Sequence, residues 1–486
     1  MIKKTLSILV LVLLLLATVV IFRTFSRTSK QLKVAPIAIL PIGDESIQHL
    51  SEAVKIQTVS YEDNLTFDTL AYLQFLAFLK STYPLSDSLL HPQTINNFSL
   101  LYRWNGSNPE LQPIILMAHY DVVPSKNGTE EHWDFDPFGG VIADGHIHGR
   151  GTLDDKVNVI GIMEAVEHLL KAGYKPERTI YLAFGHDEEI GGNNGASYIA
   201  SYLESKKVHA SFVIDEGLLV TEQIIPDTHD PVALIGISEK GYLSVELTTT
   251  SEGGHSSMPP LETNIGILSN AIAKVERRHL PARFCEPVNE FLDYLGPEMP
   301  FVKRMAFANR WLFKNVIVSA YEKSNSGYAM VHTTHASTIF KSGIKDNVLP
   351  SSAMAIINFR ILPGKTIQEV LTFLKTEIND DRVQIKVHGI GDEASPVSDI
   401  NSEGFKKIEL SIRQIFPNTI VVPSLVLGGT DSKHYQKVAD NIYRFAPIRC
   451  NSKDLDRIHG VNERIGIDNF KDCIRFYHQL ILNLKS

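Results

Sequence analysis

Three short apolar runs, each followed at once by charged residues, constrain the fold of this chain more than any other feature. They cover residues 114–117, 179–184 and 211–214. Short, bounded apolar runs are typical of strands that are buried on both faces of a sheet. Segment 157–172 has helical periodicity, so the order strand, helix, strand predicts an α/β fold. The pair Asp144-Gly145 predicts a hairpin beside that sheet.

A second pattern begins near Gly241 and predicts a smaller α+β domain inserted into the larger one. Strands are expected at 242–250, 336–341, 353–361 and 383–388, and helices at 265–277 and 367–378. The α/β pattern then resumes, with a helix at 405–415, strands at 419–427 and 441–445, and a closing helix at 470–484. We therefore expect a helix-covered mixed sheet built from residues 45–240 and 391–486, interrupted by an inserted domain at 241–390.

The N-terminal residues 1–30 predict a signal or membrane anchor that is not part of the globular fold. Residues 6–22 carry no charge and are flanked by lysines and arginines. As a helix this run would extend about 26 Å, close to the thickness of a hydrocarbon core. An uncleaved anchor is favoured over a cleaved signal, because the run is long and no clear cleavage site follows it. The rest of the chain is then expected on the exported side, as a glycoprotein if its Asn-x-Ser/Thr sites are used. These sites are Asn64, Asn97, Asn105 and Asn127.

The composition excludes several classes of function. With 44% hydrophobic and 21% charged residues, the chain is an ordinary globular sequence. Its formal charge of −8 argues against nucleic acid as a partner. The three cysteines, Cys285, Cys450 and Cys473, suit neither a disulfide framework nor a CxxC zinc site. Neither the Gly-x-Ser-x-Gly motif of serine hydrolases nor a phosphate-binding loop occurs in the sequence.

Charged side chains follow each of the three apolar runs and predict a metal site. The carboxyl ends of parallel strands meet at one edge of a sheet, so these side chains should converge. Buried carboxylates that crowd together cannot all ionise without cations. Two histidines with several carboxylates suit zinc, and a shared carboxylate can join two ions. The residues of this set are His119, Asp121, Asp154, Asp155, Glu188, Glu189, Asp215 and His459.

In chain order, these residues and their neighbours resemble the signature of a di-zinc metallopeptidase family that includes aminoacylase, carboxypeptidase S and glutamate carboxypeptidase. The resemblance runs from about residue 45 to the C-terminus. The fuller strings at 117–124, 185–189 and 443–445, with the hydrophobic N-terminus, look most like the branch of secreted N-fatty-acyl-amino-acid synthase/hydrolases and carboxypeptidase S. The matching segments are 117–124, 149–156, 185–189, 215–217, 253–257, 443–445 and His459.

The resemblance implies a role for each member of the metal set. It implies that His119 and Asp215 bind one zinc ion and that Glu189 and His459 bind the other, with Asp154 bridging both. Asp121 would accept the other imidazole N–H of His119 and fix its tautomer, a role for which its position two residues further along an extended strand is suited. The Asp154-Asp155 peptide bond is cis in the family. Glu188 would be the general base that moves a proton from water to the leaving amine.

The resemblance also implies that the larger domain is catalytic and that the inserted domain is a lid, through which some members dimerise. His255 would stabilise the oxyanion, sometimes across a dimer interface. Arg360 would hold the substrate carboxylate, although Asn358 stands where many relatives have aspartate. Asn347, Gly429 and Thr430 would also contact substrate; ordinary turns are the alternative for these two segments.

We therefore expect a zinc-dependent amidohydrolase that cleaves, and in reverse could form, the amide bond of N-acyl amino acids. Long fatty-acyl groups are favoured by the apolar stretch 311–313, but an amphipathic lid helix would have the same pattern. The alternative substrate class is short peptides, cleaved by carboxypeptidase action. A binding protein on an inactive scaffold is a third hypothesis, and the presence of both Glu188 and His459 argues against it.

Overall fold

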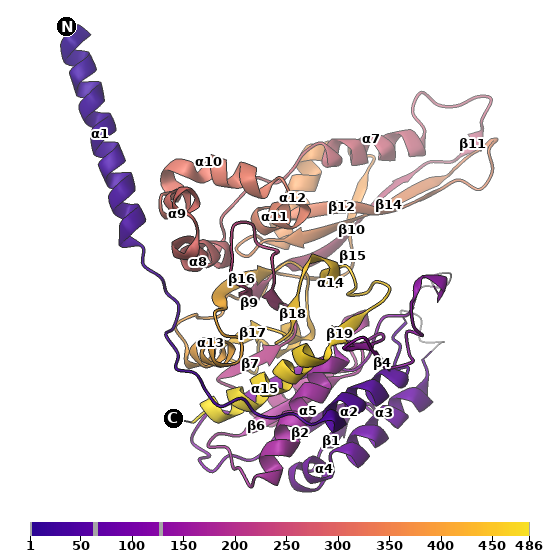
Figure 1. Ribbon diagram of the computed structural model, residues 1–486. Helices are drawn as coiled ribbons and strands as arrows, with labels where there is room; N and C mark the ends of the chain where they lie inside the picture. The colour runs from indigo at the N-terminus through magenta and orange to yellow at the C-terminus, as the bar shows by residue number, and fades with distance from the viewer. Residues whose placement is uncertain (1, 62–66, 126–129, 486) are drawn as a thin grey trace.

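The computed structural model describes residues 2–61, 67–125 and 130–485 (Figure 1). Of the four predicted glycosylation sites, Asn64 and Asn127 lie outside these residues, and Asn97 and Asn105 are exposed. The predicted fold class is confirmed, because a helix-covered mixed sheet and a separate antiparallel sheet with its own helices are both present. The residue boundaries of the domains remain a prediction.

The larger sheet contains ten strands within the described residues, in the order β1-β2-β6-β3-β7-β17-β9-β8-β18, with β16 paired to β9. The three predicted strands β3, β6 and β7 are parallel neighbours at its centre. Their carboxyl ends therefore meet at one edge, as expected. The strands are β1 (Gln93–Ile95), β2 (Ser99–Trp104), β3 (Ile114–His119), β6 (Ile180–Gly185), β7 (Phe212–Asp215), β8 (Val220–Thr221), β9 (Val232–Glu239), β16 (Ile420–Val426), β17 (Ile442–Arg444) and β18 (Arg449–Cys450).

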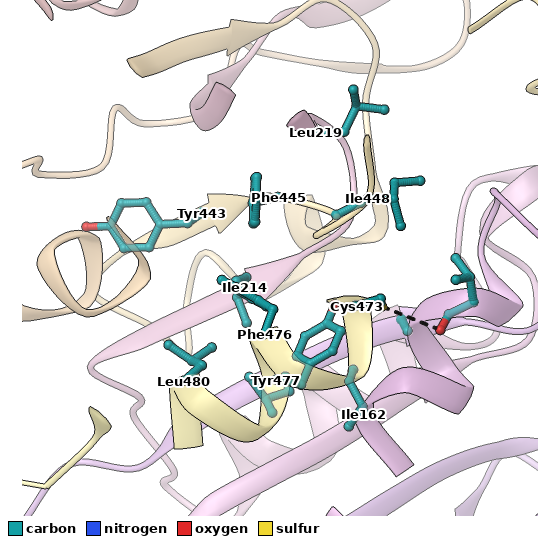
Figure 2. Close-up of a cluster of buried hydrophobic side chains, with 14 of the residues drawn as sticks. Ile162, Ile214, Leu219, Tyr443, Phe445, Ile448, Cys473, Phe476, Tyr477 and Leu480 are labelled. Carbon is teal, nitrogen blue, oxygen red and sulfur yellow. Dashed lines mark hydrogen bonds between the residues drawn. The ribbon is translucent and has the colours of Figure 1, made fainter. Parts of the chain in front are cut away.

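Helices cover both faces of this sheet because alternate residues of its strands point into two separate cores. On β3, Ile114 and Leu116 belong to one core, whereas Ile115 and Met117 belong to the other. Figure 2 shows the first core, where Phe476, Tyr477 and Leu480 on the last helix lie close to Ile162 and Ile214. The surrounding helices are α2 (Asp44–Lys55), α3 (Thr69–Thr82), α4 (Pro84–Leu90), α5 (Lys156–Lys171), α6 (Ala196–Ser205), α13 (Glu403–Ile415), α14 (Ser452–Leu455) and α15 (Ile467–Asn483).

The predicted hairpin at Asp144-Gly145 is confirmed. Both residues have positive φ, 49° and 74°, which is the geometry that a two-residue turn of this kind requires. The hairpin belongs to a small sheet in which β5 also pairs with a strand near the C-terminus. Its strands are β4 (Val141–Ala143), β5 (His146–His148) and β19 (Arg464–Gly466).

The second large sheet is fully antiparallel, in the order β12-β14-β10-β15. Its two predicted helices pack on it around a core that includes Leu243, Leu268, Phe359 and Leu374. The start of α12 is fixed by a capping box between Thr366 and Glu369, as its sequence favours. The elements are β10 (Gly241–Thr250), α7 (Asn264–Glu276), β12 (Thr334–Ser342), β14 (Ser352–Ile361), α12 (Ile367–Ile378) and β15 (Gln384–Asp392), with a small ribbon of β11 (Gly254–His255) and β13 (Val348–Leu349).

Four helices inserted between α7 and β12 do not join the core of the antiparallel sheet. Val288, Phe291, Leu292 and Leu295 of α8 recur at helical spacing and pack into the core of the larger sheet. The apolar stretch 311–313 lies in α10, which contacts α9, and α9 in turn contacts the N-terminal helix α1 (Figure 1). These helices are α8 (Glu286–Leu295), α9 (Phe301–Ala308), α10 (Arg310–Tyr321) and α11 (Asn325–Val331).

The N-terminal helix α1 (Ile2–Ser26) projects away from the rest of the molecule (Figure 1). Within the described residues it is the one helix long and apolar enough to cross a membrane. The segment that follows α1 is attached to the larger sheet. The Gln31 side chain accepts a hydrogen bond from the backbone N–H of Val421 (2.7 Å) and donates one to its carbonyl (2.9 Å).

Candidate di-metal site

The charged residues predicted to converge do so at the carboxyl ends of the central strands. His119 ends β3, and Glu188 and Glu189 form a short 3₁₀ turn (Glu188–Ile190) just after β6. Asp215 ends β7. These residues therefore lie at the same edge of the sheet.

Two groups of possible metal ligands share the carboxylate of Asp154. In the first, Nε2 of His119 lies 3.0 Å from Oδ1 of Asp154 and 3.4 Å from Oε1 of Glu216. In the second, Nε2 of His459 lies 2.9 Å from Oδ2 of Asp154 and 3.2 Å from Oε2 of Glu189. The two oxygens of Asp154 thus face different groups, which is the arrangement of a bridging carboxylate.

The donor set fits two divalent cations. Ligand atoms bound at about 2.0–2.1 Å in a tetrahedron are about 3.3 Å apart, close to the separations within each group. Oε1 of Glu189 is buried and has no hydrogen-bond partner among the described residues, so it has a free lone pair. Hydrogen bonds to Asp154 and Glu189 raise the pKa of His459 to about 10, and burial together with Asp154 raises the pKa of Glu216 to about 8. Asp154 contributes to both shifts, because its carboxylate lies close to His459 and to Glu216.

The carboxylate that faces His119 is that of Glu216, whereas the predicted ligand Asp215 faces another part of the structure. The carboxylate of Asp215 accepts a hydrogen bond from the backbone N–H of Ser432 (2.9 Å), and burial raises its pKa to about 6. Glu216 instead directs its carboxylate at His119. Adjacent residues in extended chain point in opposite directions, so only one member of an Asp-Glu pair can face the metal group, and the motif alone does not say which.

Asp121 connects the two halves of the site. Nδ1 of His119 donates a hydrogen bond to the backbone carbonyl of Asp121 (3.0 Å) and lies 3.2 Å from its Oδ1. The neutral ring therefore carries its proton on Nδ1 and leaves the Nε2 lone pair free for a metal ion. The same carboxylate accepts hydrogen bonds from the backbone N–H groups of Glu188 (3.1 Å) and Glu189 (3.2 Å).

Glu188, the predicted general base, points toward the group of possible ligands that contains His119. Its Oε2 lies 3.9 Å from Nε2 of His119. Burial, and after it the negative charge of Glu216 and Asp431, raises the pKa of Glu188 well above its usual range. A carboxylate that readily takes up a proton is suited to general base chemistry.

Asp155 is a structural neighbour of the ligands. It follows Asp154 through a cis peptide bond, as the resemblance implied. Its carboxylate accepts a hydrogen bond from the backbone N–H of His119 (3.2 Å) and another from the side chain of Asn158. Asp155 therefore helps to fix the end of β3 and the loop that carries Asp154.

Sequence reasoning gave no role to Glu463, which organises the loop that carries Asp154. Its Oε1 accepts hydrogen bonds from the backbone N–H groups of Gly151 (2.9 Å), Leu153 (2.8 Å) and Asp154 (3.3 Å). Its other oxygen forms a buried ion pair with Arg150. The available signal was its position four residues after His459, which allows one loop to carry a ligand and support another.

The two residues of the loop 428–432 that are predicted to contact substrate lie in different environments. Thr430, predicted to contact substrate, is buried, and Oε1 of Glu239 accepts hydrogen bonds from both its backbone N–H and its hydroxyl (2.8 Å each). Glu239 in turn forms a buried ion pair with Arg444 (3.0 Å). Thr430 therefore fixes the loop, whereas Gly429 is exposed and open to a ligand.

Arg360 is free to bind a carboxylate. Its guanidinium lies 4.8 Å from the ring centroid of Tyr242, on the neighbouring strand β10. In the described part of the chain no acidic side chain forms an ion pair with it. Asn358 donates a hydrogen bond to Ser244 (3.1 Å), so it does not support Arg360.

His255 and Asn347 lie together on an exposed tip of the antiparallel sheet. His255 is in β11, and its neighbour Ser256 donates a backbone hydrogen bond to the carbonyl of Asn347 (3.3 Å). The backbone N–H of Ser257 donates to Nδ1 of His255 (3.1 Å), so the neutral ring presents an N–H at Nε2. Figure 1 shows β11 away from the larger sheet, so these two residues are not brought to the metal ligands within this chain.

Comparisons with known proteins agree with this geometry. Residues 115–483 match Peptidase family M20/M25/M40. The probable carboxypeptidase S-like 2 of Dictyostelium discoideum is 39% identical over 477 residues, covering 96% of this chain and 91% of that protein. The N-fatty-acyl-amino acid synthase/hydrolase PM20D1 of Xenopus tropicalis is 40% identical, covering 90% and 85%, and the human protein is 39% identical, covering 89% and 86%.

Solved structures share the fold at lower identity. The M20 family metallo-carboxypeptidase Sso-CP2 from Sulfolobus solfataricus aligns with a TM-score of 0.67 at 20% identity, covering 91% of this chain and 99% of that one. Human carnosine dipeptidase 1 aligns with a TM-score of 0.61 at 15% identity, covering 91% and 96%.

Proposed function

This chain belongs to peptidase family M20/M25/M40, and from that premise we propose that it is a di-zinc amidohydrolase that cleaves N-fatty-acyl amino acids. Relatives named as N-fatty-acyl-amino acid synthase/hydrolases, at 38–40% identity over most of the chain, support this substrate class. Because amide hydrolysis is reversible, condensation at high fatty-acid and amino-acid concentration is a corollary. The carboxypeptidase S-like relatives support short peptides as the second candidate substrate.

The observation that carries the proposal is the shared carboxylate of Asp154. Its two oxygens lie 3.0 Å from His119 and 2.9 Å from His459, so one side chain can bridge two ions. We assign His119 and Glu216 to one ion, and Glu189 and His459 to the other. Histidine with carboxylate ligands is a donor set that zinc accepts.

The residues around the bridge account for hydrolysis. When bound, the ions supply Lewis acidity that polarises an amide carbonyl and lowers the pKa of water. Glu188 accepts the proton of the attacking water and delivers it to the leaving amine nitrogen. Asp121 holds the Nδ1 tautomer of His119 and, through two backbone N–H groups, the turn that carries Glu188.

Residues of the antiparallel sheet complete the proposed site. Arg360, which has no acidic partner in the described residues, binds the substrate carboxylate through its planar guanidinium. His255 stabilises the oxyanion through its Nε2 proton, and Asn347 contacts substrate beside it. Because both lie on an exposed tip, we propose that a second copy of the chain presents them, which makes the enzyme a homodimer through the lid.

We also propose that α1 is retained as a membrane anchor, with the remainder on the exported side. The side chain of Asn309, which is buried, donates hydrogen bonds to the carbonyl of Val20 (3.1 Å) and to the hydroxyl of Thr24 (3.2 Å). Arg304 donates to the carbonyls of Thr24 (3.2 Å) and Arg27 (2.7 Å). Removal of α1 would break the hydrogen bonds of Asn309 to Val20 and Thr24 and that of Arg304 to Thr24, which argues against cleavage.

The test measures phenylalanine release by mass spectrometry from N-oleoyl-phenylalanine and from a blocked dipeptide ending in phenylalanine. The full chain is used in detergent, with Glu188→Gln as the test variant and Glu204→Gln, an exposed glutamate on α6, as the matched control. We expect kcat/KM to be at least about tenfold higher for the lipid conjugate, and about 10²–10⁴-fold lower in Glu188→Gln than in the control.

Two results would contradict the proposal. Faster cleavage of the dipeptide would assign the chain to the carboxypeptidase class. Equal rates for Glu188→Gln and Glu204→Gln would mean that Glu188 is not the base.

Removal of metal by a chelator should abolish activity in the wild type, and zinc should restore it.

A further inference from the structure

Helices α9 and α10 expose five large apolar side chains. These five residues, which we call the α9–α10 apolar surface, are Phe301 (50% exposed), Val302 (70%), Trp311 (55%), Leu312 (43%) and Val316 (64%). The two helices are consecutive and contact each other. A cluster of exposed apolar side chains marks an interaction surface on a folded protein.

The position of this surface identifies what it meets. The rings of Phe301 and Phe25 are 6.0 Å apart, and Asn309, between the two helices, bonds to the carbonyl of Val20. Val20 belongs to the charge-free stretch 6–22 of α1. Figure 1 shows α9 near the end of α1 that is nearest the body, and α10 follows directly after α9. Wherever the apolar part of α1 enters a bilayer, these two helices are therefore at its boundary.

The charges of this segment match the same environment. Residues 301–323 hold five basic residues and a single acidic one, Glu322, in a chain whose formal charge is −8. Basic residues among exposed aromatic and aliphatic ones are typical of helices that lie in a membrane interface, where lipid phosphates attract the cations. The basic residues are Lys303, Arg304, Arg310, Lys314 and Lys323. Lys303 forms an ion pair with Asp227 and Arg310 with Asp293, whereas Lys314 and Lys323 have no ion-pair partner among the described residues and are free to meet lipid phosphates.

We infer that the α9–α10 apolar surface inserts into the boundary between lipid head groups and acyl chains, next to the anchor. This inference rests on the proposed retention of α1 and extends it, because it gives the catalytic body a second attachment to the bilayer. Two attachments fix the orientation of the body relative to the membrane.

The test uses the full chain in phosphatidylcholine vesicles and measures tryptophan quenching by lipids brominated near the head-group end of the acyl chain. The chain has three tryptophans; Trp104 is buried in β2, and Trp133 lies before β4. Trp311→Phe keeps the apolar character of α10 and isolates the contribution of Trp311. We expect brominated lipid to quench the wild type at least about twofold more than Trp311→Phe.

Three outcomes have separate meanings. The inference would be overturned if brominated lipid quenches both proteins equally and aqueous iodide quenches Trp311. In that case, sedimentation with vesicles that resists carbonate would still support the anchor. Failure of the full chain to sediment with vesicles would overturn both. Self-association in detergent that Val316→Glu abolishes, without lipid quenching, would assign the surface to a second copy of the chain instead.

Discussion

The carboxylate of Asp121 accepts a hydrogen bond from the backbone N–H of Glu189 (3.2 Å) while it also faces Nδ1 of His119 (3.2 Å). One buried side chain thus joins the end of β3 to the turn after β6. Since His119 and Glu189 belong to different ligand groups, Asp121 sets the distance between two proposed metal sites without binding either ion.

Replacing Asp121 by asparagine should lower metal affinity or kcat/KM by about 10–100-fold, because an amide group cannot accept from all the donors that now face the carboxylate. Zinc content and kcat/KM are the measurements. Asp68→Asn is the matched control, since Asp68 caps α3 through Leu70 and Ala71 and asparagine caps a helix equally well. An unchanged zinc content and rate in Asp121→Asn would refute the positioning role.

The assignment of Glu216 in place of Asp215 predicts different zinc contents for two neighbouring variants. Glu216→Gln should reduce bound zinc from two ions to about one per chain, because a neutral amide is a poor zinc ligand. Asp215→Asn should retain both ions, because its carboxylate faces Ser432. Elemental analysis of the purified proteins decides between them. The opposite pattern would restore Asp215 as the ligand.

Arg360→Lys should raise KM about 10-fold or more with a small effect on kcat, because an ammonium group cannot bind a carboxylate through two parallel hydrogen bonds. A substrate whose carboxylate is converted to an amide should show no difference between wild type and variant. Arg278→Lys, on an exposed arginine next to α7, is the control. The same KM change with both substrates would show that Arg360 acts on the fold rather than on the carboxylate.

Glu409 should make folding stability depend on pH. It is buried in α13, and burial raises its pKa from 4.5 to about 7. The folded state therefore binds the proton more tightly than the unfolded state. The contribution of Glu409 to the free energy of unfolding is largest below about pH 4.5. It falls as pH rises from about 4.5 to about 7 and stays reduced above that range.

Thermal unfolding of Glu409→Gln in detergent tests this dependence. The variant should match the wild type at pH 5 and unfold at least about 2 °C higher at pH 8, because it has no buried charge to desolvate. Glu204→Gln, which alters an exposed glutamate, should show no such difference between the two pH values. If the unfolding temperatures of Glu409→Gln and of the wild type differ by the same amount at pH 5 and pH 8, Glu409 is not the source of the pH dependence.

Local patterns predicted the regular elements well. Helix α12 spans the predicted residues 367–378, and β3, β6 and β7 were located by their apolar runs. The packing of α8 could not be predicted in the same way. Its apolar face is clear from the sequence, but two sheets were available to receive it, and only the assembled structure shows that it packs on β16.

The sequence predicted which motifs lie at the site, but not which side chain of a motif faces the other possible ligands. Convergence of His119, Glu189 and His459 followed from strand order and resemblance, whereas the choice between Asp215 and Glu216 depends on which way a side chain points as β7 ends. Thr430 shows the same limit. The resemblance implies that Thr430 contacts substrate, but it does not reveal that the buried carboxylate of Glu239, distant in sequence, accepts the hydrogen bond of its hydroxyl.

The pair of hydrogen bonds between Gln31 and Val421 has a consequence for the solubility of shortened forms of this protein. Among the described strands β16 pairs only with β9, so its other side is a free edge, and the Gln31 amide occupies the backbone donor and acceptor of Val421 there. An uncovered strand edge is a template for pairing with another molecule. A chain cut after residue 31 would expose that template and tend to aggregate through β16, whereas one that keeps Gln31 would stay dispersed.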